Sequence, residues 1–130
     1  MTRLSTIVIA GAGQAGFQAA ASLRQAGFRG ELCLVGDEAG LPYQRPPLSK
    51  AYLSGKLSRE GLLFRAKAFF SDNDIRVIDN TRVTKLDRLS KRVMLSSGEA
   101  LHYDHLILAL GARNRALAVE GRDLDGVFGL

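Results

Sequence analysis

The sequence predicts an α/β fold, in which a parallel sheet with flanking helices also carries an antiparallel β-meander. The first observation is a short β-branched run at residues 6–10, followed by a glycine turn and a helix-forming stretch at residues 17–24 that ends near Gly27. The second is the return of continuous apolar runs at residues 32–35 and 105–110, as in strands buried on both faces. Between those two runs, short strand-like segments are separated by turn signals. This order is typical of a Rossmann-like unit.

The glycine turn between the first strand and the first helix has the sequence GAGQAG. Gly11 permits a tight turn, Gly13 lets a pyrophosphate approach the backbone, and Gly16 lets the helix pack closely on the strand. The first N–H groups of the helix and the positive end of its dipole would face the phosphates, so Gln14 and Ala15 join the candidate site. The alternative is a glycine-containing turn in an ordinary α/β unit.

An acidic pair follows the second strand. Asp37 lies 21 residues after Gly16, and an acid about 20 residues beyond such a turn accepts the ribose hydroxyls of a dinucleotide. Glu38 is a second candidate beside it. An acid rather than a base at this place favours an adenosine ribose without a 2′-phosphate.

A proline-rich string follows the acids, and it contains the tandem prolines Pro46 and Pro47. Pro47 at a first helical position predicts a helix over residues 48–53, with Lys50 on its first turn. The helix dipole disfavours a cation there, so the lysine needs a compensating partner such as the anionic or electron-accepting edge of a cofactor. The alternative is an exposed lysine.

The rest of the chain completes the predicted order. An amphipathic helix is expected at residues 66–73 and a strand at residues 75–78. A meander of three strands and a final parallel strand ending at Gly111 follow, at residues 81–87, 92–96, 100–102 and 105–110. The apolar run at residues 126–130 resembles an incomplete strand.

Composition and charge restrict the class of protein. The length of 130 residues corresponds to one domain, and no segment approaches 18 uninterrupted apolar residues, so we expect a soluble, cytoplasmic protein without a membrane span. The net charge of +5 is concentrated in residues 41–67, which hold six basic residues against one acid. Such a segment can steer an acidic ligand or partner, whereas a nucleic-acid motif is absent. The alternative is a solvated basic loop.

The single cysteine excludes one type of chemistry. Flavin-linked disulfide reduction needs two neighbouring cysteines, and Cys33 is the only one, so we interpret it as a buried, inert thiol. His102 and His105 lack metal-ligand spacing, which leaves structural or surface roles and no predicted metal site. No Ser/His/Asp or Cys/His arrangement suggests a nucleophile.

Three strings together resemble a known family. Residues 11–16, 35–38 and 45–53 are similar to the N-terminal part of FAD-dependent ferredoxin reductases of the putidaredoxin reductase and biphenyl dioxygenase reductase type, within the pyridine nucleotide-disulfide oxidoreductase-like superfamily. The resemblance covers the whole chain. It implies FAD as cofactor, NADH as electron donor, and an acidic [2Fe–2S] ferredoxin that serves a cytochrome P450 or dioxygenase system as partner.

The resemblance also implies roles for individual residues. Lys50 would contact the flavin ring, Asp37 the adenosine ribose, and Ala15 the phosphate region. Further cofactor-binding candidates are Glu38 and Arg45 in the matching strings, Val83 near the adenine, and the triplet Ala109, Leu110 and Gly111 at the end of the last strand. Leu110 replaces the threonine usual in the family, so a hydroxyl hydrogen bond is lost there.

A second dinucleotide-binding turn is expected in a reductase that takes hydride from a nicotinamide, and none follows residue 16. We therefore expect residues 1–130 to be the N-terminal segment of a discontinuous FAD-binding domain, with the NAD-binding and C-terminal interface domains outside this chain. The alternatives are a non-catalytic flavin- or nucleotide-binding module, or a related rubredoxin, monodehydroascorbate or nitrite reductase.

Overall fold

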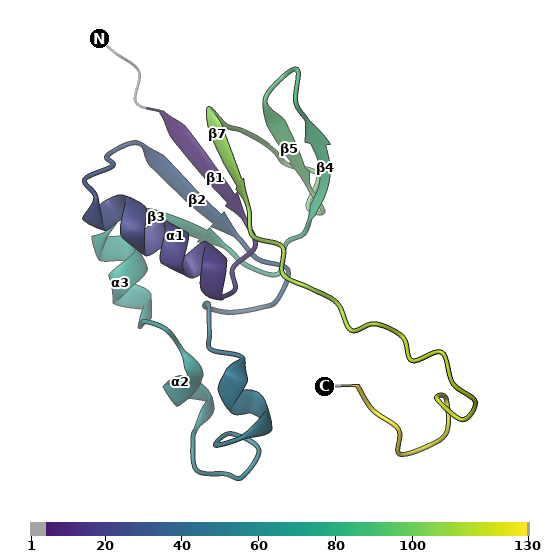
Figure 1. Ribbon diagram of the computed structural model, residues 1–130. Coiled ribbons are helices and arrows are strands. Elements are labelled where there is room, and N and C mark those ends of the chain that lie inside the picture. Colours follow the sequence, from purple (N-terminus) through teal and green to yellow (C-terminus); the bar gives the residue numbers. More distant parts are fainter. Residues whose placement is uncertain (1–4, 130) are drawn as a thin grey trace.

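The computed structural model describes residues 5–129, and its centre is a four-stranded parallel sheet (Figure 1). Neighbouring strands are parallel throughout, with Val8 opposite Cys33 on one side and Leu106 on the other. The strands, in the spatial order β3-β2-β1-β7, are β1 (Thr6–Ala10), β2 (Glu31–Val35), β3 (Ile75–Ile78) and β7 (His105–Leu108). The predicted parallel sheet is confirmed.

A different layer covers each face of this sheet. One face packs against two helices, α1 (Gln14–Gln25) and α3 (Lys67–Asp72), and its core includes Ile7, Ile9 and Phe17. The other face packs against the predicted meander, and its core includes Val8 and Val93. The meander strands are β4 (Val83–Asp87), β5 (Arg92–Leu95) and β6 (Ala100–His102). Side chains alternate between the two faces of a strand, and both faces of β1 are covered. Successive residues of β1 must therefore suit a buried environment, and all five are buried.

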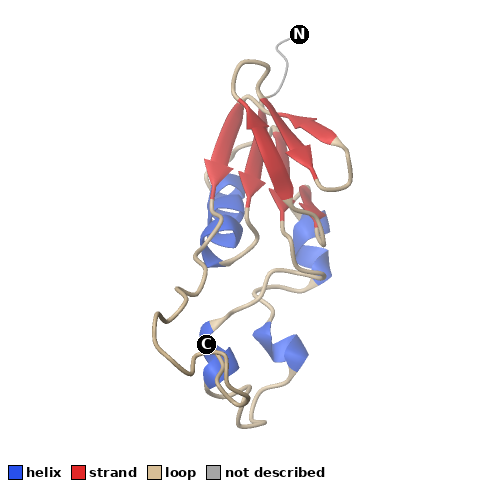
Figure 2. Ribbon diagram, turned by 90° about the vertical axis from the view of Figure 1, so that its right-hand side faces the viewer, coloured by secondary structure: helices blue, strands red, loops and turns tan. Residues whose placement is uncertain are grey.

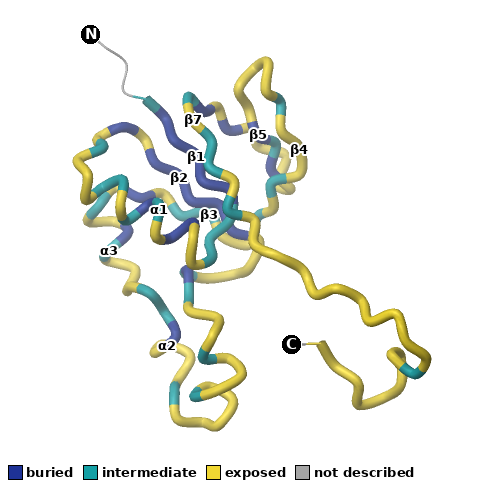
Figure 3. The backbone as a smooth tube through the Cα atoms, viewed as in Figure 1, coloured by how far each residue is buried: buried dark blue, intermediate teal, exposed yellow. Residues whose placement is uncertain are grey.

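Between β2 and α3 the chain makes an excursion beyond the carboxyl ends of the strands (Figure 2). The excursion contains a 3-10 helix, Pro46–Ser49, and the short helix α2, Arg59–Leu62. It returns to the core through Phe64, which stacks on Phe17 with ring centroids 4.6 Å apart. Residues 109–129 follow β7 on the same side of the sheet without helix or strand and are largely exposed (Figure 3).

The helix predicted over residues 48–53 is wrong. Residues 46–49 form a 3-10 helix, and residues 50–55 form successive turns. The two prolines supply the first φ angles but no N–H groups, and Gly55 adopts a positive φ of 71° that ends the segment.

Other boundaries differ by a few residues. α1 begins at Gln14 instead of residue 17, because Gly13 already serves as its N-cap and accepts the first helical hydrogen bond from the Phe17 N–H at 2.9 Å. β7 ends at Leu108, and the predicted strand at residues 126–130 is not formed by residues 126–129, while residue 130 lies outside the described residues. α2 was not predicted; its signal is Ser58, whose hydroxyl accepts from the Gly61 N–H at 3.2 Å.

Candidate functional site

The carboxyl end of β1 lies where the order of the sheet reverses. The chain proceeds from β1 to β2 and β3 on one side, and β7 then pairs with the opposite side of β1. Open parallel sheets bind ligands outside the carboxyl ends of their strands at such a reversal. The glycine turn leaves β1 at this point, and residues 109–111 leave β7 beside it (Figure 1).

The three glycines of the turn have different surroundings. A Cβ on Gly11, which has a φ of +114°, would lie 1.9 Å from the Ala109 carbonyl oxygen, and a Cβ on Gly16 would lie 1.8 Å from the Gly11 carbonyl oxygen. Close backbone packing therefore requires both glycines. A Cβ on Gly13 would meet no atom within 4 Å. Gly13 borders open space, as expected of a backbone that a ligand approaches.

The N-terminus of α1 points into the same space. Gly13 caps the helix, and no described side chain hydrogen bonds to its first N–H groups or places a negative charge in its first turn. The N–H groups of Gln14, Ala15 and Gly16 precede the first helical hydrogen bond, so they have no acceptor within the helix. With the helix dipole, they suit an anionic group such as a pyrophosphate.

The two acids after β2 point to different neighbours. Asp37 Oδ2 accepts a hydrogen bond from the Arg82 guanidinium at 3.1 Å. Glu38 Oε2 accepts from the Tyr43 hydroxyl at 2.6 Å, and its Oε1 forms an ion pair with Arg45. The pKa of the Tyr43 hydroxyl is raised, mainly by partial burial and secondly by its hydrogen bond to Glu38. A shallow hollow of about 30 Å³ links this acidic pair to Ala12 of the glycine turn.

Lys50 does not lie on the first turn of a helix. It follows the 3-10 helix as its C-cap, and its Nζ donates to the Pro46 carbonyl oxygen at 3.3 Å. A cation is favourable at the carbonyl end of a helix, so the predicted conflict with the helix dipole is wrong. A role for Lys50 beside a cofactor is therefore supported by the family resemblance alone.

The remaining candidates lie on two sides of the turn. Val83 begins β4, packs partly against the core between the sheets, and follows Arg82, the partner of Asp37. Ala109 donates its N–H to the Ala10 carbonyl oxygen at 2.8 Å, which continues the pairing of β7 with β1. Leu110 is 67% exposed where the family has a threonine, and Gly111 follows it with a φ of 70°. Ala109 thus lies against the glycine turn, and Val83 lies next to the residue that pairs with Asp37.

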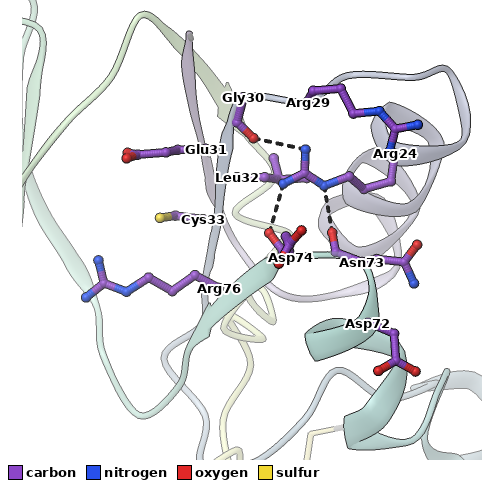
Figure 4. Close-up of a pocket in the computed structure, with 10 residues that line it drawn as sticks. All are labelled: Arg24, Arg29, Gly30, Glu31, Leu32, Cys33, Asp72, Asn73, Asp74 and Arg76. Atoms are coloured by element: carbon purple, nitrogen blue, oxygen red, sulfur yellow. Dashed lines mark hydrogen bonds between the residues drawn. The ribbon is translucent and has the colours of Figure 1, made fainter. Parts of the chain in front are cut away.

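A cavity of about 520 Å³ lies away from the glycine turn, at the amino ends of β2 and β3 (Figure 4). The cavity is lined by as many acidic as basic residues. The guanidinium of Arg24 already donates its hydrogen bonds to the protein backbone. Arg24 donates to four backbone carbonyls, at 2.7 Å to Phe28, 2.8 Å to Asn73, 2.8 Å to Asp74 and 2.9 Å to Gly30. These bonds join the end of α1 to the beginnings of β2 and β3, so Arg24 has a structural role.

Cys33 lies on β2, facing the meander, and is only 7% exposed. Burial raises the pKa of its thiol, although the nearby Arg76 acts in the opposite direction. The neutral thiol is therefore the form present near pH 7, as expected of an inert structural cysteine.

The raised pKa of Cys33 predicts a pH dependence of stability. Because the folded state holds the thiol proton more tightly than the unfolded state, this contribution is complete below the unfolded pKa and is lost as the pH rises through the folded one. Cys33→Ala should therefore lose less free energy of unfolding than the parent protein between pH 7 and pH 10. Urea unfolding at both pH values measures the difference, and equal losses would contradict the assignment.

Residues 5–129 contain neither a metal-binding cluster nor a membrane-spanning helix. No group of three or more His, Cys, Asp or Glu side chains there is arranged to hold a metal ion. None of the helices in that part of the chain has the length and apolar character needed to cross a membrane.

The comparisons with known proteins agree with this geometry. Rhodocoxin reductase from Rhodococcus erythropolis is 55% identical over 122 residues, which are 94% of this chain and 29% of that protein. The crystal structure of the ferredoxin reductase for the CYP199A2 system from Rhodopseudomonas palustris superposes with a TM-score of 0.88 at 50% identity, covering 95% of this chain and 30% of that one. The reductase chain in the covalent putidaredoxin reductase–putidaredoxin complex gives a TM-score of 0.86 at 42% identity, covering 92% of this chain and 29% of that one.

The chain thus spans less than a third of the length of these relatives. Residues 5–130 match the family described as pyridine nucleotide-disulphide oxidoreductase. A family match over nearly the whole sequence, a fold shared with solved reductases and a glycine turn at the reversal of the sheet lead to one conclusion: this chain belongs to the pyridine nucleotide-disulphide oxidoreductase family.

Proposed function

We propose that this chain supplies most of the FAD site of an NAD(P)H-dependent ferredoxin reductase, whose partner is an acidic [2Fe–2S] ferredoxin of a P450 or dioxygenase system. The observation that carries the proposal is the edge where Gly13 and the open end of α1 lie beside Asp37, in a chain 55% identical to rhodocoxin reductase. The family implies use of a flavin and NAD(P)H. FAD is the flavin whose pyrophosphate and adenosine this edge would suit.

The residues present fit FAD in three places. The N–H groups of Gln14 and Ala15, with the open backbone at Gly13, would hold the pyrophosphate. Asp37 would accept the ribose hydroxyls, because its Oδ2 has one side-chain partner and no described residue donates to its Oδ1. Lys50 would lie near the flavin ring, as the family resemblance implies.

When bound, the flavin accepts two electrons as hydride and releases them singly, which suits a one-electron iron–sulfur acceptor. The chain contributes position and charge. The basic excursion lies beyond the carboxyl ends of the strands, as the site does, and is largely exposed (Figure 3). Its exposed basic residues include Lys56, Arg59 and Arg65. An acidic ferredoxin would be steered toward this side.

The same reasoning leads to a proposal about domain organisation. Residues 1–130 would be the N-terminal segment of a discontinuous FAD-binding domain in a longer enzyme. The chain spans 29% of rhodocoxin reductase, so the NAD-binding and C-terminal interface domains would lie in the remainder. The length of the natural protein, measured by intact mass, tests this organisation.

The experiment that tests the function combines a spectrum with an acceptor assay. The natural enzyme should purify with flavin absorbance bands and should transfer electrons from NADH to a [2Fe–2S] ferredoxin. Reduction of rubredoxin in preference to ferredoxin would identify a rubredoxin reductase. Bound flavin without transfer to any acceptor would indicate a non-catalytic flavin module and contradict the proposal.

Lys50→Ala is expected to weaken FAD binding by about 10-fold, or to shift the flavin midpoint potential, because a cation beside the ring stabilises its anionic reduced form. Lys56→Ala, in the same excursion, is the matched control and should leave both quantities near the parent values. Equilibrium dialysis and a redox titration measure them. Equal and negligible effects of the two substitutions would contradict the assignment of Lys50.

A further inference from the structure

Glu38, the second acid after β2, is bound to the segment that follows it. One carboxylate oxygen accepts from the Tyr43 hydroxyl at 2.6 Å, and the other pairs with the Arg45 guanidinium. The guanidinium carbon of Arg45 also lies 5.3 Å from the centre of the Tyr43 ring, a cation–π contact. Glu38, Tyr43 and Arg45 thus form a closed triangle between the end of β2 and residues 42–50, here called the proline segment.

Asp37 has a different set of neighbours. Its Oδ2 accepts from Arg82, which precedes β4 of the meander, and no described residue donates to its Oδ1. The Asp37 carboxylate therefore keeps one oxygen for a ligand, whereas both oxygens of the Glu38 carboxylate already have partners. The two adjacent acids are therefore paired with different parts of the chain.

The proline segment itself has few hydrogen bonds to the sheet, although Pro42 is buried and Gly40, just before the segment, donates its N–H to Asp79 Oδ2 at 2.6 Å. Its backbone bonds join it to the end of α2, from the Gln44 N–H to the Leu62 carbonyl at 2.9 Å and from the Phe64 N–H to the Pro42 carbonyl at 3.2 Å. A cavity of about 380 Å³ lies beside it, lined by residues of both parts of the excursion. Side-chain bonds from Glu38 therefore link the proline segment directly to the residues that follow β2.

We infer that Glu38 is a positioning residue that holds the proline segment, with Lys50 at its end, against the candidate site, rather than a second ribose acceptor beside Asp37. The positioning part stands on the contacts of this chain, and the ribose part rests on the proposed function. Under this division Glu38 and Arg45, which the resemblance also named as cofactor-binding candidates, would act through the position of the proline segment.

Hydrogen exchange of the purified protein without flavin tests the positioning part. In Glu38→Gln, amides of residues 43–52 should exchange about 3–10-fold faster, because local opening of the segment becomes easier. Tyr43→Phe, which removes one side of the same triangle, should accelerate the same amides. The matched control is Glu99→Gln, because the Arg76–Glu99 pair has side-chain exposures of 57% and 47%, against 58% and 47% for Arg45–Glu38. Unchanged exchange of residues 43–52 in both Glu38→Gln and Tyr43→Phe would overturn the inference.

FAD titration of the natural enzyme tests the ribose part. Asp37→Asn should weaken FAD binding by about 10-fold or more without changing the spectrum of the saturated flavin. Glu38→Gln should weaken it less, and at saturation should shift the flavin spectrum in the direction that Lys50→Ala shifts it. A greater loss of affinity in Glu38→Gln than in Asp37→Asn would assign the ribose to Glu38 and overturn the division. If the parent enzyme binds no FAD, the proposed function fails, while the exchange experiment still decides the positioning role.

Discussion

Replacing Gly16 by alanine is expected to lower the free energy of unfolding by about 3 kcal/mol or more. The new Cβ would lie 1.8 Å from the Gly11 carbonyl oxygen and 3.3 Å from Leu34 Cδ1. The turn cannot retreat, because the Gly11 N–H is bonded to the Val35 carbonyl at 2.8 Å. α1 must therefore move away from the sheet, which opens the core around Phe17.

Urea unfolding followed by circular dichroism measures this loss. Gly13→Ala is the matched control, because its Cβ meets no atom within 4 Å and its backbone is already extended. The control should lose less than about 1 kcal/mol, since alanine is only a poorer N-cap than glycine. Equal stability of the two variants would contradict the close contact of α1 with the turn.

The same Gly13→Ala substitution is expected to have the largest effect on ligand binding. It should weaken the affinity for FAD by about 100-fold. No protein atom occupies the space that the methyl group would enter. The pyrophosphate is proposed to approach the backbone there, so the methyl group would push it away from the N–H groups of Gln14 and Ala15.

Isothermal titration of the natural enzyme with FAD measures the change in the dissociation constant. Gln18→Ala is the matched control, because Gln18 is exposed on α1 and its side chain bonds only to Ser22, at 3.0 Å. That variant should bind FAD like the parent. Parent-like affinity in Gly13→Ala would place the ligand elsewhere.

The glycine turn shows how far sequence reasoning reaches. The spacing predicted which glycines serve the turn and the helix contact, and the collisions calculated for Gly11 and Gly16 confirm both. The contact of Gly16 with Gly11 is a local consequence of one strand leading directly into one helix, so it needs no knowledge of distant residues, whereas the neighbour of Gly11 is the distant Ala109. The meander and the parallel strands were predictable for a similar reason. Apolar residues alternate along a strand that is buried on one face and run continuously along a strand that is buried on both.

The proline segment shows where that reasoning fails. Pro47 at a first helical position suggested a helix and a lysine in conflict with the helix dipole, but the segment forms a 3-10 helix and turns, with Lys50 at the carbonyl end. The different partners of Asp37 and Glu38 were equally out of reach. They depend on Arg82, which is 45 residues from Asp37 in the chain, and on the path of the excursion.

The sequence by itself determined the strand–turn–helix unit, the acid that follows the second strand and the absence of a cysteine pair. Each of these depends on residues close together in the chain or on composition alone. Only the tertiary structure decided that β7 lies beside β1, that residues 109–111 therefore face the glycine turn, and that adjacent acids have separate partners. The physical reason is that these arrangements come from packing between elements distant in the chain, which local propensities do not encode.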